Sequence, residues 1–452
     1  MSVFNGKRLT NKTFKLDIER MRRGWYSDKY FETIGRLLTE MSRRGYRFEG
    51  HSPRALPVDP TGISIGEMRV EMQWFTRREP FALVAGVDKA LTMLRYCAGH
   101  FDENGVFVET WQDLEVEAVQ DGVFAPYDGN PLNVRPVLKV RGRLRDFCVL
   151  ETPTLGILSR ASRIATNVYN VLRAARGKPV LFFPARFDVH EVQAADGYAY
   201  DIAVQRFNQD YGHQIRSFVS TDAQGDWWGG AGGGTVPHAV IATFLGDTTA
   251  AMLAFAATQP PEVARVALVD FENDCVGTSL AVVRAYWERY RALLEAGQEA
   301  EARRYVLFGV RLDTSGNMRD RSIVSLGMPE LDLGVNPRLV TAVREALDHA
   351  WQDWADLDET WLPRAQAFCR QVRIIVSGGF NPEKIRRFER LAVPVDIYAV
   401  GSSLMSNDAE TNTDFTADVV RVCLGDQWVP MAKVGRAAAD NPDLKPVDLS
   451  IF

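Results

Sequence analysis

The sequence predicts a mixed α/β protein in which an irregular α/β barrel follows an N-terminal antiparallel part. Two observations support this prediction. Up to about residue 150, short runs of alternating polar and apolar residues are separated by turn-rich segments, as in antiparallel strands. From Glu151 onward, a long helical pattern is followed by β-branched runs that alternate with helices, which is typical of a parallel sheet or barrel.

The N-terminal part is predicted to contain one helix, over residues 28–43, followed by strands. The runs "RVEMQWFTRREPFALVAG" (69–86) and "RPVLKVRGRL" (135–144) alternate in the manner of half-buried strands. The C-terminal stretch from Asp414 returns to the same alternation, so it can rejoin the N-terminal sheet. We therefore expect two domains, an α+β domain of residues 1–150 plus 412–452 and a barrel domain of residues 151–411.

The barrel strands are predicted as continuous β-branched and aromatic runs, as expected for strands that are buried on both faces. Helices are expected over 280–296 and 337–349, and a helical segment over 235–245. About six strands favour an irregular barrel over a regular eightfold one. The glycine-rich segment 226–235 is interpreted as a mobile or backbone-exposing loop. The predicted strands are residues 179–183, 214–220, 265–269, 305–312, 372–376 and 395–400.

Composition excludes several classes of protein. The 452 residues are 46% hydrophobic, which allows a large core, and the net charge of -5 does not attract nucleic acid. The five cysteines form no C-x-x-C pair, which argues against a zinc site or a disulfide framework. The polar N-terminus and the lack of an apolar run near ~20 residues predict a cytoplasmic protein without a membrane span.

Two successive predicted strands end in loops of small residues. The run 374–376 stops at Ser377, Gly378 and Gly379, and the next strand stops at Gly401 and Ser402. Parallel strands present such loops at one edge of a sheet, where bare backbone N–H groups can cradle phosphate. The alternative is a pair of ordinary turns in which glycine supplies a positive φ.

Other strand ends carry charged side chains, and the carboxyl ends of barrel strands are where active residues gather. Arg311 and Asp313 are two residues apart, so they face the same side of their strand. Asp270 ends another strand and can hold Mg²⁺. Arg186 follows a third strand, with Asp188 and His190 beyond it, and His238 opens a helix. The alternatives are an internal Arg311–Asp313 salt bridge, a helix cap at Asp270 and a structural histidine.

Cations, carboxylates and bare amides at one rim suit the displacement of pyrophosphate from a phosphorylated sugar. Carboxylates stabilise the positive charge that develops on the ring, while arginines and Mg²⁺ stabilise pyrophosphate. No covalent nucleophile is needed, in agreement with the lack of a G-x-S-x-G or H-E-x-x-H motif.

The ordered motifs "FFPAR", "GGGTVPH", "GVRLDTSG", "GVNPRLV", "VSGGFN" and "YAVGSSL" resemble nicotinate phosphoribosyltransferase, a type II phosphoribosyltransferase. The resemblance spans residues 151–420. The N-terminal "SDKYF" is similar to the T-D-x-Y segment of that family.

The resemblance implies an irregular α/β barrel joined to an open-sandwich domain, and a homodimer or higher oligomer paired head to tail. It implies that nicotinate and phosphoribosyl pyrophosphate give nicotinate mononucleotide and pyrophosphate, with ATP hydrolysis and Mg²⁺, in NAD salvage. Carried over by position, the site residues take the following roles. Tyr30 stacks on nicotinate in a neighbouring subunit; Arg186 and Arg311 contact carboxylate or phosphate; Asp270 and Asp313 flank ribose and Mg²⁺; His238 is phosphorylated; and the two small-residue loops hold the 5′-phosphate.

The chain departs from the family pattern at two places near this site. Phe187 stands where relatives often have a second arginine, and Ser315 lies in an unusual "DTSGNMRD" continuation. The alternatives are therefore a quinolinate or nicotinamide phosphoribosyltransferase, a barrel lyase or isomerase that would need a lysine at a strand end, and a non-catalytic binding relative.

Overall fold

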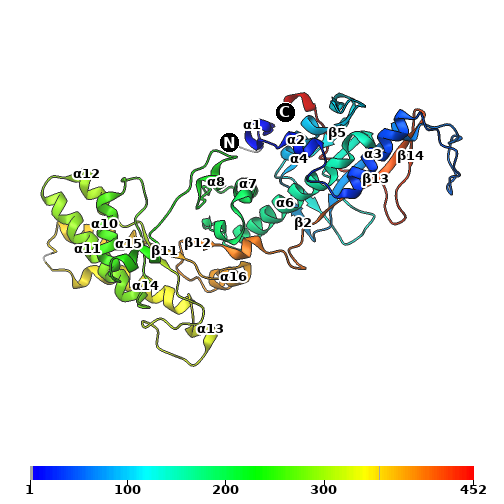
Figure 1. Ribbon diagram of the computed structural model, residues 1–452. Helices are drawn as coiled ribbons and strands as arrows, with labels where there is room; N and C mark the ends of the chain where they lie inside the picture. The colour runs from blue at the N-terminus through cyan, green and yellow to red at the C-terminus, as the bar shows by residue number, and fades with distance from the viewer. Residues whose placement is uncertain (1–3, 356) are drawn as a thin grey trace.

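The protein was analysed as a computed structural model, which describes residues 4–355 and 357–452. Two sheets organise the chain: an antiparallel sheet of six strands and a parallel sheet of five. Figure 1 shows them toward opposite ends of an elongated molecule, with the long helix α6 (Glu151–Ala174) between them. No helix of the described residues is both long and apolar enough to cross a membrane.

The antiparallel sheet joins the two ends of the chain. The strand from the C-terminal stretch, β13, pairs with β1, as the alternation after Asp414 predicts. The domain bounds at 150 and 412 stay a prediction. In order across the sheet, the strands are β14 (Gln427–Pro430), β13 (Phe415–Leu424), β1 (Arg69–Thr76), β7 (Leu138–Arg143), β5 (Glu115–Ala118) and β15 (Lys445–Pro446).

A buried carboxylate helps to set the register of this sheet. Glu71 of β1 is fully buried and forms ion pairs with Arg141 of β7 at 2.6 Å and Arg421 of β13 at 2.7 Å. Both arginines are its direct cross-strand partners. A shift of one residue would leave the carboxylate buried without its cations, which is strongly unfavourable.

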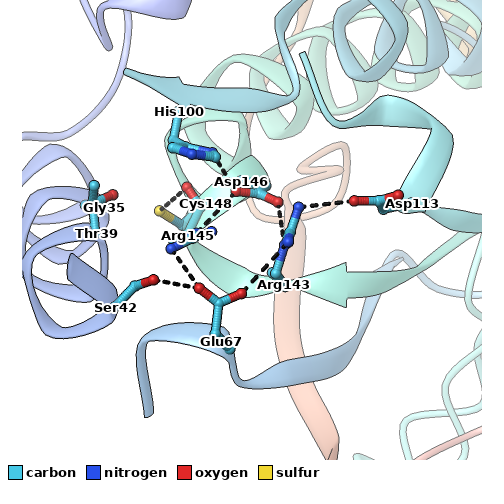
Figure 2. A network of polar contacts seen from close by, with 10 residues as sticks. All are labelled: Gly35, Thr39, Ser42, Glu67, His100, Asp113, Arg143, Arg145, Asp146 and Cys148. Atoms are coloured by element: carbon cyan, nitrogen blue, oxygen red, sulfur yellow. Dashed lines mark hydrogen bonds and ion pairs between the residues drawn. The ribbon is translucent and has the colours of Figure 1, made fainter. Parts of the chain in front are cut away.

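The predicted N-terminal helix is present as α3 (Lys29–Arg43) and is attached largely through polar contacts, since none of its residues is fully buried. Figure 2 shows Glu67 between Ser42 of α3 and the Arg145 guanidinium of α5 (Leu144–Phe147), whose Nη1 lies 2.8 Å from Glu67 Oε1. Asp146 in turn contacts Arg143 at 2.8 Å and His100 at 3.2 Å. The outer face of α3 is left exposed.

The parallel sheet forms the core of the barrel part. Its order is β8 (Val180–Phe182), β12 (Ile397–Val400), β11 (Arg373–Val376), β10 (Gly309–Leu312) and β9 (Val266–Leu268), and every neighbouring pair is parallel. The carboxyl ends of these strands therefore meet at one edge. Helices α11 (Cys275–Glu295) and α14 (Pro337–His349) contain the predicted helical segments.

The predicted strand 214–220 is wrong. The structure has only isolated parallel bridges at Val219, to Phe182 on one side and Gly232 on the other. The preceding backbone is bound elsewhere, because the Asn208 side chain accepts from the Ile215 N–H and donates to its carbonyl. Such local side-chain bonds compete with a strand ladder. The barrel is consequently irregular beyond β8. The predicted strand 305–312 is likewise shorter, since β10 begins only at Gly309.

The glycine-rich loop 226–235 is packed against its neighbours. Trp227 is 9% exposed, and its ring lies 4.9 Å from that of Phe14. A Cβ on Gly225 would stand 2.2 Å from the Gly230 carbonyl oxygen, so close backbone approach explains this glycine.

A buried carboxylate in the N-terminal part predicts a pH-dependent stability. Asp121 accepts hydrogen bonds from the Val87 N–H at 2.9 Å and the Tyr198 hydroxyl at 3.1 Å. Burial, reinforced by the charge of Asp88, raises the pKa of Asp121 to about 7. Between the pKa of the unfolded chain, about 3.9, and about 7, the folded state alone holds this proton, so the free energy of unfolding falls by up to about 1.4 kcal/mol per pH unit.

The Asp121→Asn variant is expected to lose this contribution, because its amide does not ionise. Urea unfolding at pH 5 and pH 7.5 should show a smaller decrease in the free energy of unfolding for the variant than for the wild type. Asp226→Asn, at an exposed carboxylate, serves as the control and should follow the wild type. Equal decreases in all three proteins would contradict the assignment.

Candidate active site

A cavity of about 420 Å³ opens at the edge where the parallel strands end. Its walls come from the segments that follow β8, β10, β11 and β12, together with the start of α9 (His238–Thr243). Most of the predicted site residues line it, namely Arg186, His238, Arg311, Asp313, Ser377, Gly378, Gly379, Gly401 and Ser402. The structure thus brings together side chains that are up to about 215 positions apart along the chain.

Arg311 is a largely buried cation with spare hydrogen-bond donors. Its Nη1 donates to Thr235 Oγ1 at 3.2 Å, and its buried Nε has no partner among the described residues. Burial lowers the pKa of Arg311, while the nearby Asp313 and Asp270 oppose that shift. A guanidinium with unpaired donors at a cavity wall is a binding group for an anion, because a buried charge is otherwise costly.

The loop after β11 exposes backbone to the cavity and is anchored to β10. Gly378 and Gly379 have φ of +86° and +69°, a region that side chains other than glycine rarely adopt. The Ser377 hydroxyl donates to Asp313 Oδ1 at 2.7 Å, and its backbone N–H donates to the Leu312 carbonyl at 2.9 Å. The carboxylate is therefore held beside the glycines.

The loop after β12 lies beside the first one. The Ser403 hydroxyl donates to the Phe380 carbonyl at 3.0 Å, which ties the two loops together. A Cβ on Gly401 would stand 2.7 Å from Cε2 of Phe187, so this position has room only for glycine. Two adjacent loops with small residues can surround a phosphate group.

His238 and Asp270 form a dyad at the cavity. The His238 Nε2 lies 3.0 Å from Asp270 Oδ1, and the histidine side chain is 45% exposed while that of Asp270 is 9% exposed. Burial raises the pKa of Asp270, whereas the hydrogen bond and charge of His238 lower it. With a proton shared between Nε2 and the carboxylate, the lone pair of Nδ1 is left free to act as a nucleophile.

Aromatic side chains that sequence reasoning missed also line the cavity. Phe183, Phe187 and Phe380 follow β8 and β11 directly, so their position at strand ends was the available signal. The Arg186 guanidinium lies 5.4 Å from the centre of the Phe187 ring, which is 45% exposed. An exposed aromatic ring beside a cation can receive a flat, negatively charged ring system.

Other predicted residues lie elsewhere. Asp188 is paired with Arg160 of α6 at 2.7 Å, and His190 with Glu191 at 3.2 Å, so neither contributes to the cavity as the strand-end pattern suggested. Asp274 caps helix α11 by accepting from the Gly277 N–H.

Tyr30 lies on α3, outside the cavity of its own chain. Its side chain is 58% exposed, its hydroxyl reaches Asp28 at 3.4 Å, and its ring contacts that of Phe31.

The donor set fits Mg²⁺ only as part of a complex with substrate. Among the described residues no group of three or more potential ligands could hold a metal ion. Asp270 and Asp313 are nonetheless close enough to influence each other's charge. Mg²⁺ is commonly bound by one or two carboxylates together with water and substrate phosphate oxygens, which these residues satisfy.

Comparison with known proteins supports the fold. Residues 57–162 match the family model of the quinolinate phosphoribosyl transferase N-terminal domain. The crystal structure of nicotinate-nucleotide pyrophosphorylase from Pyrococcus furiosus aligns over 94% of this chain and 80% of its own, with a TM-score of 0.60 and 24% identity. That of human nicotinic acid phosphoribosyltransferase aligns over 88% and 74%, with a TM-score of 0.55 and 17% identity. The predicted fold, an α/β barrel with a sandwich domain, is confirmed.

Proposed function

We propose that this chain, which has the fold of the type II phosphoribosyltransferases, transfers a phosphoribosyl group from phosphoribosyl pyrophosphate to nicotinate. The products are nicotinate mononucleotide and pyrophosphate, an addition to the NAD pool. The observation that carries the proposal is the under-bonded guanidinium of Arg311, which shares one cavity with two small-residue loops and two carboxylates.

Each group has a role in this chemistry. The loops at Ser377–Gly379 and Gly401–Ser402 bind the 5′-phosphate through backbone N–H groups. Asp270 and Asp313 stabilise the positive charge that develops on the ribose ring as pyrophosphate leaves. Bound Mg²⁺, held by these carboxylates and by pyrophosphate oxygens, neutralises the leaving group.

The charge of the cavity favours a base with one carboxylate. Arg186 and Arg311 are the arginines that line it within the described chain, and Phe187 presents an apolar ring next to them. A second carboxylate on the base would face that ring rather than a cation, at a cost in desolvation. This supports nicotinate over quinolinate. Nicotinamide, which lacks a carboxylate, would leave an arginine without its anion.

The dyad of His238 and Asp270 supports coupling to ATP. Asp270 orients the imidazole through Nε2, so Nδ1 can accept a phosphoryl group from ATP. The imidazole is partly exposed at the cavity rim, where a nucleotide can reach it. Hydrolysis of the phosphohistidine would then drive the transfer toward mononucleotide.

The oligomer belongs to the same proposal. In a head-to-tail pair, the exposed Tyr30 of one copy would reach the cavity of the other and stack on the base.

Quinolinate phosphoribosyltransferase is the second candidate, because the family model over residues 57–162 carries that description. A Schiff-base lyase is disfavoured, since no lysine is among the described residues that line the cavity.

A panel of three bases tests the proposal. Purified protein is incubated with phosphoribosyl pyrophosphate, Mg²⁺ and nicotinate, nicotinamide or quinolinate, each with and without ATP, and mononucleotide is measured by chromatography and mass spectrometry. We expect product from nicotinate alone. The Arg311→Met variant controls for contaminating enzymes.

Two outcomes would change the assignment. Product from quinolinate, with release of carbon dioxide, would identify the second candidate. No product from any base, with correctly folded protein, would favour a non-catalytic relative.

A further inference from the structure

Lys384 lies directly behind the first phosphate-binding loop. It occupies the first turn of α16 (Pro382–Arg390), whose start is capped by Asn381 through the Lys384 N–H at 2.8 Å. Its Nζ donates to the Gly378 carbonyl at 3.3 Å, and Gly378 is one of the two glycines with positive φ. Lys384 itself is not among the residues that line the cavity. The carbonyl is therefore turned toward the helix and away from the bound substrate.

The surroundings of this ammonium are mostly apolar. Nζ lies 4.2 Å from the centre of the Phe380 ring and 5.9 Å from that of Phe388. Within the described chain no carboxylate forms an ion pair with it, and the nearest charge that affects it is the like charge of Arg387. Burial lowers the pKa of Lys384 to about 8, so the side chain is still mainly protonated at pH 7.

A half-buried cation without a carboxylate partner is unfavourable unless an anion lies close by. The nearest place for an anion is the other side of the Gly378–Gly379 turn, in the cavity. By holding the Gly378 carbonyl, the ammonium also fixes the orientation of the peptide groups on that turn, so the loop needs no rearrangement when phosphate binds.

We propose that Lys384 is a positioning residue for the sugar phosphate: it locks the Gly378–Gly379 turn with its N–H groups toward the cavity and adds positive charge behind them. This inference rests on the proposed function of the site, because it assumes that the turn binds the 5′-phosphate of phosphoribosyl pyrophosphate.

The test compares Lys384→Met, which keeps the aliphatic stem but removes the charge, with Lys384→Arg, which retains a charged donor. Arg390→Met, at the far end of the same helix, is the matched control. Because a tenfold change is the effect of one charge-assisted hydrogen bond, Lys384→Met should raise the KM for phosphoribosyl pyrophosphate about tenfold and change kcat by less than about threefold. Lys384→Arg should return KM to within about threefold of the wild type, and the control should leave it unchanged.

Calorimetry with ribose 5-phosphate separates this inference from the proposed function. If the wild type shows no transfer but binds ribose 5-phosphate, and Lys384→Met binds it about tenfold more weakly, the proposed function fails while the lysine assignment stands. A wild-type KM in Lys384→Met, a loss confined to kcat, or no binding of ribose 5-phosphate by the wild type would overturn the assignment. Thermal unfolding of each variant confirms that the comparison is between folded proteins.

Discussion

Replacement of Arg311 by methionine is expected to lower kcat/KM for mononucleotide formation roughly a thousandfold, the cost of truncating one partner of a buried, charge-assisted pair. Methionine fills the space of the side chain but offers no donor to the bound anion. In the absence of substrate, the guanidinium donates only to Thr235 and leaves its buried Nε unpaired. Loss of the charge should therefore affect the liganded enzyme far more than the stability of the free one.

Two further variants make this result specific. Arg311→Lys retains the charge without the planar fork, so an intermediate loss is expected. Arg373→Met removes an arginine at the opposite end of the same sheet, where it lies over the Phe308 ring, and should change kcat/KM by less than about twofold. If Arg311→Met keeps a third or more of the wild-type kcat/KM, Arg311 does not bind the substrate.

The second large effect is expected at His238. In the His238→Ala variant, ATP should no longer stimulate mononucleotide formation, because no imidazole remains to accept the phosphoryl group, while a basal rate without ATP is retained. The measurement is the initial rate with nicotinate and phosphoribosyl pyrophosphate, in the presence and absence of ATP. The stimulated rate should fall to the basal rate.

His190→Ala is the matched control for this experiment, since that histidine is highly exposed and bound only to Glu191. It should be stimulated by ATP as the wild type is. Asp270→Asn should weaken the stimulation as well, because it removes the carboxylate that orients Nε2. Full stimulation of His238→Ala by ATP would show that no phosphohistidine forms at this position.

The strand ends were predictable because their signals are local. A continuous apolar run that stops at small or charged residues marks the carboxyl end of a buried strand, and parallel strands necessarily bring such ends to one edge. This reasoning located Arg311, Asp313 and both small-residue loops before their contacts were known. It also anticipated that β13 joins the N-terminal sheet, since both segments alternate with the same period.

Other features depend on contacts that leave no local mark in the sequence. Asp188 follows the same strand as Arg186, yet Arg160 of α6 captures it on another side. The segment 214–220 has strand-like residues, but the Asn208 side chain satisfies the backbone at Ile215. The role of Phe187 in the cavity wall depends on its packing against Gly401, more than 200 positions later. Local periodicity cannot report such long-range choices.

The central claim is that the two small-residue loops and Arg311 bind a phosphorylated ribose at one rim of the parallel sheet. A crystal structure with ribose 5-phosphate bound tests it most directly. The account predicts the phosphate within hydrogen-bond distance of backbone N–H groups at Gly378–Gly379 and Gly401–Ser402, with the ribose facing Asp313. Phosphate bound anywhere else, with those loops free of it, would contradict the account.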